Sequence, residues 1–144
     1  MVYLKNNLTP SKMNHTICYL SSAAGNLPDH ELKQLFKKTQ SRNIDQEISG
    51  ILLFYYGNFL QVLEGDKDRL HPLFDIIKKD NRHKNIITIF NKQNEGRTFA
   101  GYKSGFSIVK TSSDLKNLNV YLNNNKDKTP LSSSVLSLLE PFLI

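Results

Sequence analysis

The chain has 144 residues, of which 39% are apolar and 22% charged, with one cysteine and a formal net charge of +6. This length and apolar content fit one globular domain with a single core, and one cysteine excludes an internal disulfide. The positive charge favours anionic partners, but the lysines are spread over predicted helix surfaces and the tail, so charge alone identifies no partner.

The N-terminal segment has no feature that targets the chain to a membrane. Residues 1–14 lack the apolar core of a signal peptide, and no apolar stretch in the chain reaches the roughly 18 residues of a membrane span. The cysteine, Cys18, lies in an apolar run, where a reduced thiol acts as a small hydrophobe. We therefore expect a cytoplasmic protein without a membrane partner, in which residues 1–14 form a loose leader.

The first regular elements are a strand and a helix. The apolar run "HTICYL", residues 15–20, predicts a buried strand that ends at the loop "SSAAGNLP". Asp29 then has the chemistry to cap a helix, in which Leu32, Leu35 and Phe36 fall on one face. This face is expected to cover a sheet.

Two strands follow, joined by a tight turn. The segment "ISGILLFYYGNFLQVLEG", residues 48–65, contains two apolar runs separated by residues 56–58, which is a hairpin signal. Both runs are apolar at successive positions instead of alternating. Such strands are covered on both faces, so helices or a partner must lie on each side of the sheet.

A second helix is predicted from Asp66 or Asp68 to Lys79, with an apolar stripe at helical spacing. Because proline lacks a helical donor, Pro72 is expected near the first turn.

The remaining chain contains two strands and two helices. The strands are predicted at residues 85–90 and 104–109, and the helices at 112–122 and 132–143, with a linker at 123–130. The complete order gives an α+β fold with a ferredoxin-like βαββαβ sheet, an added fifth strand and C-terminal helices.

Gln61 is a polar residue inside the second strand of the hairpin. A buried amide without partners costs about 1 to 3 kcal/mol, so its donors and its acceptor should be bonded. A structural bond to a neighbouring loop would satisfy it. In a βαββαβ sheet, however, the first and third strands pair at the centre, so Tyr19 and Gln61 can be neighbours. A phenol beside an amide forms a hydrogen-bond chain whose direction can reverse.

The sequence resembles the BLUF family, whose members are blue-light sensors that bind a flavin. The matching segments are residues 18–23 ("CYLSSA"), 42–65 ("RNIDQEISGILLFYYGNFLQVLEG"), 80–86 ("DNRHKNI") and 99–106 ("FAGYKSGF"). The resemblance covers about residues 15–110, and it implies that this range is the sensor core.

The resemblance also implies a photochemical pair and a cofactor site. Tyr19 would donate an electron and a proton on excitation by blue light, through Gln61, which bridges the phenol to the flavin ring. Gln61 would then settle in an altered hydrogen-bond arrangement that shifts the flavin spectrum to the red. The implied cofactor-binding residues are Thr39, Asn43, Gln61, Asp80, Arg82 and His83.

The expected cofactor is FAD, with FMN and riboflavin as alternatives, because the family grips the flavin ring system more than the adenine. No substrate is converted, so no catalytic residue is expected. The histidines at 15, 30, 71 and 83 show no metal-site spacing, and no metal is expected.

The fifth strand departs from the family pattern at two positions. Tyr102 occupies the position where the family often has tryptophan, and Ser104 the position where methionine is usual. These residues would relay the signal to residues 111–144, the helical extension. Serine could bond to the Gln61 amide or admit water, whereas a strand end without any photochemical role is the alternative.

Three other functions fit parts of the sequence. A basic ferredoxin-like RNA-binding module would need a basic, aromatic strand, but the Gln61 strand lacks lysine and arginine. An acylphosphatase-like enzyme would need an anion-binding loop that "SSAAGNLPD" does not provide. A BLUF-like protein with impaired signalling is the third. We expect a photoreceptor without an enzymatic output domain that forms homo-oligomers and signals to a downstream protein partner, with no nucleic-acid partner.

Overall fold

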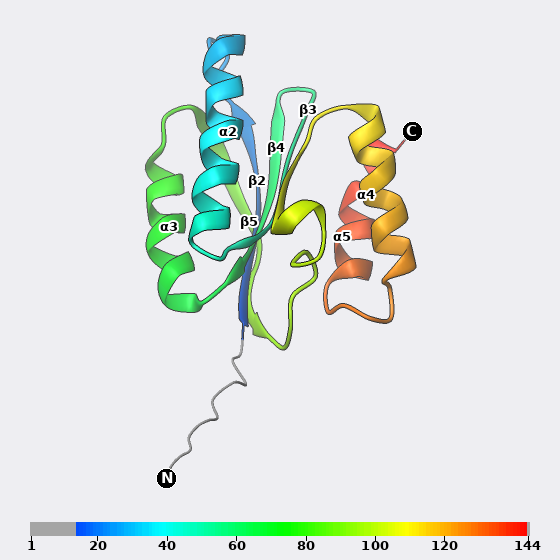
Figure 1. Cartoon of the computed structure of the whole chain (residues 1–144). Coiled ribbons are helices and arrows are strands. Elements are labelled where there is room, and N and C mark those ends of the chain that lie inside the picture. The colour runs from blue at the N-terminus through cyan, green and yellow to red at the C-terminus, as the bar shows by residue number, and fades with distance from the viewer. Residues whose placement is uncertain (1–13, 144) are drawn as a thin grey trace.

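The computed structural model describes residues 14–143 (Figure 1). The expected leader lies outside this range except for Asn14, which begins the first strand. The elements are β2 (Asn14–Ala23), α2 (Asp29–Asp45), β3 (Ser49–Tyr55), β4 (Asn58–Gly65), α3 (Lys67–Lys79), β5 (His83–Asn94), η1 (Lys103–Gly105), β6 (Phe106–Val109), α4 (Ser112–Asn124), α5 (Ser132–Leu139) and η2 (Glu140–Phe142).

The five strands form one mixed sheet in the order β5-β2-β4-β3-β6. Strand β2 is antiparallel to β4 and β5, β3 is antiparallel to β4, and β6 lies parallel to β3 at the edge. Helices α2 and α3 cover one face of the sheet, and α4 and α5 cover the other (Figure 1). The predicted ferredoxin-like order, its fifth strand and its C-terminal helices are confirmed.

Each face of the sheet has its own apolar core, because successive strand residues point to opposite sides. Cys18 and Val62 pack in the cluster that includes α4 and α5, whereas Ile17 and Leu63 pack against α2 and α3. All four side chains are fully buried. The uninterrupted apolar pattern of β2, β3 and β4 therefore reflects helices on both sides, the first of the two kinds of cover, helices or a partner, that the sequence allowed.

Two predictions at helix termini are wrong. Pro28, not Asp29, is the N-cap of α2, and Asp29 is the first helical residue, where its carboxylate favours the positive end of the helix dipole. In α3, Asp66 is the cap and accepts from the Asp68 amide at 3.0 Å, which fixes the start of the helix. Pro72 consequently lies beyond the first turn, on an exposed face that leaves its ring in solvent.

The predicted strand bounds also need correction near the end of the sheet. Strand β5 extends over 83–94, well beyond the predicted 85–90, because the ten residues of β2 provide pairing partners along its length. Strand β6 begins at Phe106 instead of at residue 104. Ser104 has a φ of 62°, which is incompatible with a strand, and it belongs to the turn η1.

The C-terminal helix α5 packs on the molecule's own core. It has eight residues, too few for a stable isolated helix, and Val135 and Leu139 bury its apolar side beside α4. Within residues 14–143 no helix combines the length and apolarity needed to cross a bilayer.

Candidate functional site

A cleft opens between α2, α3 and the sheet, on the face opposite α4 and α5. Both helices and the sheet contribute to its apolar lining, with Leu35 on α2, Phe59 on β4 and Ile77 on α3. Against this lining lie polar side chains that the sequence had singled out. They are Tyr19, Thr39, Gln61, Asp80, Arg82 and His83.

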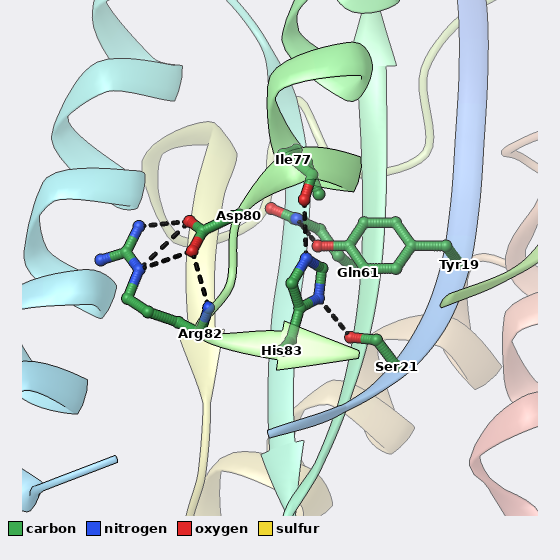
Figure 2. A network of polar contacts seen from close by, with 7 residues as sticks. All are labelled: Tyr19, Ser21, Gln61, Ile77, Asp80, Arg82 and His83. Atoms are coloured by element: carbon green, nitrogen blue, oxygen red, sulfur yellow. Dashed lines mark hydrogen bonds and ion pairs between the residues drawn. The ribbon is translucent and has the colours of Figure 1, made fainter. Parts of the chain in front are cut away.

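Tyr19 and Gln61 are directly paired residues of neighbouring central strands. Gln61 Nε2 donates to Tyr19 Oη at 2.5 Å, and each side chain is only 3% exposed (Figure 2). The other end of the amide, Gln61 Oε1, is buried and has no hydrogen-bond partner among the described residues. The predicted contact between these residues is therefore present, and it leaves an unused acceptor beside the cleft.

The Gln61 amide has two orientations that differ in what they offer a ligand. As described, the phenol accepts from Nε2 and the amide oxygen remains for the ligand. After a half rotation the phenol would donate to Oε1, and the amide would present N–H donors instead. Since the Tyr19 hydroxyl can donate or accept, both orientations keep that bond. The pair is a two-state element.

The surroundings of Tyr19 keep its phenol neutral. Burial raises the pKa of Tyr19 above its ordinary value; the bond from Gln61 and the charge of Arg42 act in the opposite direction, and Asp80 adds to the increase. The ring packs against Phe74 at a centroid distance of 5.6 Å and against His83 at 6.0 Å. A proton thus stays on the Tyr19 oxygen until another process removes it.

His83 is held in a defined tautomer by two elements. Its Nε2 lies 2.7 Å from the Ile77 carbonyl oxygen, which can only accept, so Nε2 carries the proton (Figure 2). Its Nδ1 then accepts from the Ser21 hydroxyl at 2.7 Å. Sequence reasoning missed Ser21, although it lies two residues after Tyr19 and hence on the same face of β2.

Asp80 and Arg82 form a clamp at the turn between α3 and β5. The Arg82 Nη2 and Nε atoms bond to the Asp80 carboxylate at 2.5 to 3.1 Å, and the Arg82 amide also donates to it at 2.9 Å. These bonds hold the pKa of Asp80 below, and that of Arg82 above, their ordinary values. The bonds to Asp80 fix the position of the Arg82 guanidinium group at the cleft.

Helix α2 contributes Thr39 and Asn43, one turn apart on the same side. Thr39 lines the cleft, whereas Asn43 is fully buried and is not among the residues that line it. In the described part of the chain neither Asn43 Nδ2 nor Asn43 Oδ1 has a hydrogen-bond partner. A buried amide with its donor and its acceptor unused is costly, and both groups of Asn43 are available to a ligand.

Two cations on α2 line the same cleft and were missed by sequence reasoning. Lys38 and Arg42 are four residues apart, a spacing that places them on one helix face. They also border a second hollow, whose other lining residues are Lys37, Ser41, Asp45 and Gln46. Burial and the neighbouring Arg82 lower the pKa of Arg42. Lys38 and Arg42 can pair with an anionic group in the cleft.

The two expected relay residues lie away from this cleft. Tyr102 is 9% exposed and packs against Tyr121 of α4, with a centroid distance of 4.5 Å. Ser104 is exposed in η1. Of the predicted cofactor-binding residues, all but Asn43 line the cleft, whereas Tyr102 packs against a C-terminal helix. Among the described residues, no group of three or more His, Cys, Asp or Glu side chains gathers to hold a metal ion.

Comparison with known proteins identifies the same class of protein as this fold and cleft. The family model described as "Sensors of blue-light using FAD", BLUF, matches residues 15–105. Photoactivated adenylate cyclase subunit alpha-like protein FB of Euglena gracilis is 34% identical over 84 residues, which are 58% of this chain. This match covers 8% of that relative, so the chain spans less than a tenth of its length.

Solved structures agree with the family match. The BLUF domain of BlrP1 superposes with a TM-score of 0.72 at 28% identity, over 92% of this chain and 90% of that one. Klebsiella pneumoniae BlrP1 with FMN and cyclic diGMP gives a TM-score of 0.70 at 30% identity, over 91% of this chain and 34% of that one. The chain belongs to the BLUF family of blue-light sensors, as the sequence predicted.

Proposed function

We propose that this chain is a blue-light photoreceptor that holds a flavin in the cleft between α2, α3 and the sheet. The observation that carries the proposal is the bond from Gln61 to Tyr19, with the second amide atom of Gln61 unused beside the cleft. The unused amide of Asn43 supports it, because a flavin pyrimidine edge offers both donors and acceptors.

The residues of the chain have separate tasks in this proposal. A bound flavin supplies the absorption of blue light and an acceptor for one electron and one proton. Tyr19 holds the proton at Oη, Gln61 links the phenol to the cleft and can rotate, and Asn43 and Thr39 orient the ligand. His83, fixed by Ile77 and Ser21, packs against the Tyr19 ring.

FAD is the proposed cofactor, and the cations of α2 support a phosphorylated flavin. Lys38 and Arg42 line the cleft and could pair with phosphate, whereas riboflavin has no phosphate to pair with. We expect FAD and FMN to bind at least about tenfold more tightly than riboflavin, which corresponds to about 1.4 kcal/mol. Fluorescence titration of the three flavins tests this order, and equal affinities would contradict it.

The proposed output is binding and not catalysis. The chain would signal through its C-terminal helices to a second copy of itself or to a downstream protein. Sedimentation of the dark and illuminated protein would test self-association.

An absorption spectrum of the purified protein, taken before and after blue light, tests the proposal. The expected result is a yellow protein whose flavin bands move reversibly to the red. If the protein stays colourless in saturating flavin, the proposal is wrong.

A second candidate is a BLUF-like protein that binds flavin with impaired signalling. The exposed Ser104, in the position where the family usually has methionine, favours it. In that case the flavin is bound and its bands barely move on illumination.

A further inference from the structure

Glu64 is a buried carboxyl group near the end of β4 that the flavin cleft does not use. It lies three residues after Gln61 on the same strand and is 0% exposed. Because strand residues alternate, its side chain points to the opposite face of the sheet from Gln61, toward α4 and α5. A carboxyl group in such a place needs specific partners.

Three donors converge on this carboxyl group. The backbone amides of Thr98 and Phe99 donate to it at 2.6 and 2.9 Å, and the Ser49 hydroxyl donates at 2.9 Å. Burial raises the pKa of Glu64, while the three donors and the charge of Arg97 partly offset this increase. The Glu64 carboxyl thereby fixes the connection between β5 and β6 to the central strand.

Thr98 continues these bonds to both C-terminal helices. Its carbonyl oxygen accepts from the Tyr121 hydroxyl of α4 at 2.6 Å, and its Oγ1 accepts from the Leu131 amide, at the N-cap of α5, at 3.0 Å. Thr98 is only 1% exposed, so water cannot easily replace these bonds. One residue therefore joins β4, α4 and α5 through three different groups.

We infer that the Glu64 carboxyl, through Thr98, couples the strand that carries Gln61 to helices α4 and α5 and is the output link of this sensor. The inference rests on the proposed function, since it concerns how a change at Gln61 leaves the flavin side. It also supplies a route on this chain that does not depend on Ser104, which is exposed and lies away from the cleft.

The physical basis is the stiffness of a buried, fully bonded connection. Gln61 and Glu64 are about 10 Å apart along one strand, which is held by hydrogen bonds to β2 and β3. A displacement of β4 that accompanies rotation of the Gln61 amide must either move the Thr98 segment with it or break bonds that solvent does not replace. In both cases the contacts of α4 and α5 change.

Hydrogen exchange of the flavin-loaded protein in darkness and under blue light tests the coupling. We expect the wild-type chain to show a light-dependent change of exchange in α4 and α5. In Glu64→Gln, the amide group replaces one acceptor with a donor and cannot receive both backbone amides. This variant should keep the red shift and lose at least about half of the exchange difference in α4 and α5.

Glu95→Gln is the matched control. It replaces a carboxylate by an amide in the same way, but Glu95 is exposed in the connection between β5 and β6. It should behave as the wild type. If Glu64→Gln is too unstable to load with flavin, Tyr121→Phe and Thr98→Val each remove one later bond and should lower the exchange difference in α4 or α5, respectively.

Two outcomes overturn the coupling while leaving the photoreceptor intact. One is a wild-type chain whose flavin bands shift without any exchange difference in α4 and α5. The other is a light-dependent exchange difference in α4 and α5 that is as large in Glu64→Gln as in the wild type. If Glu64→Gln cannot be loaded with flavin, the same result in both Tyr121→Phe and Thr98→Val overturns the coupling. Absence of a red shift in the wild-type chain refutes the proposed function instead, and the coupling falls with it.

Discussion

At Gln61, one side chain belongs both to the sheet and to the cleft. Its Nε2 is bonded to Tyr19, while its Oε1 has no partner among residues 14–143. An apolar residue would stabilise the same strand without an unused acceptor, so a purely structural account of this glutamine is insufficient.

Replacement of Gln61 by leucine separates flavin binding from the light response. Gln61→Leu should still bind flavin, because Asn43 and the apolar lining remain, and it should lose the red shift completely. Absorption spectra before and after illumination measure both effects. A normal shift in this variant would exclude the amide from the response, and Asn58→Leu, at the exposed start of β4, is the control.

We expect Asn43 to lower the stability of the flavin-free protein and to raise its affinity for flavin. Asn43→Leu removes a buried amide whose two polar atoms have no partner within the described range, so the flavin-free protein should keep or gain stability, by about 1 kcal/mol. Flavin affinity should fall at least about tenfold. Urea unfolding without flavin and a flavin titration measure the two effects; a stable variant with unchanged affinity would remove Asn43 from the site.

The ion pair of Asp80 with Arg82 should make the free energy of unfolding depend on pH in the acid range. The bonds to Arg82 lower the pKa of Asp80 in the folded state, so they stabilise the fold above the ordinary aspartate value, and this contribution is lost as the pH falls through the lowered pKa. The Arg82 side chain is 40% exposed, which limits the effect to about 0.5 to 1 kcal/mol.

Urea unfolding at pH 5 and pH 2.5 measures this contribution. The loss of stability between the two pH values should be smaller in Asp80→Asn than in the wild type. Asp127→Asn, at an exposed site, should lose as much as the wild type. Equal losses in all three proteins would show that the clamp does not stabilise the fold.

At the scale of single elements, strands β3 and β4 approach too closely at Gly50 for any side chain. Its φ is 146°, and a Cβ there would lie 1.8 Å from the Val62 carbonyl oxygen. Gly50→Ala should therefore destabilise the fold by about 3 kcal/mol or more. Gly57, in the hairpin turn, also has a positive φ but has open space around it, so Gly57→Ala should cost about 1 kcal/mol. Chemical denaturation compares the two, and similar losses would contradict the clash.

Elements with a strong local pattern were predictable, and those decided by distant contacts were not. The hairpin at residues 56–58 and the helix stripes follow from periodicity and turn chemistry alone. The extension of β5 depends on its pairing with β2, and the turn at Ser104 depends on a left-handed backbone that no residue type there requires. Neither the extension of β5 nor the turn at Ser104 could be anticipated from the local sequence.

The candidate site shows the same division. The contact between Tyr19 and Gln61 followed from strand order, because both residues belong to the central pair. The bonds of His83 to Ser21 and Ile77 depend on how α3 lies over the sheet, and local sequence does not contain that information. Glu64 was missed because an acid beside a glycine at a strand end normally faces solvent.

At the scale of the whole molecule, the sheet separates two layers with different tasks. Helices α2 and α3 lie on one face and α4 and α5 on the other (Figure 1). The cleft lies between α2, α3 and the sheet, and α4 and α5 bury apolar side chains on the opposite face. A signal that starts in the first layer must therefore cross the sheet through its backbone or around its edge. Glu64 provides the first kind of path, since it shares a strand with Gln61.

The native thiol of Cys18 can report movement of α4 and α5 away from the sheet, so no cysteine needs to be introduced by mutation. Cys18 is the chain's one cysteine, is 0% exposed beneath the α4 and α5 layer, and burial raises its pKa to about 12. We expect a thiol reagent to modify Cys18 when the side chains of α4 and α5 in its cluster move away from it. The rate of that modification, compared in darkness and in blue light, reports how often the output layer opens. Because Cys18 directly precedes Tyr19, its modification rate is measured next to the photochemical pair.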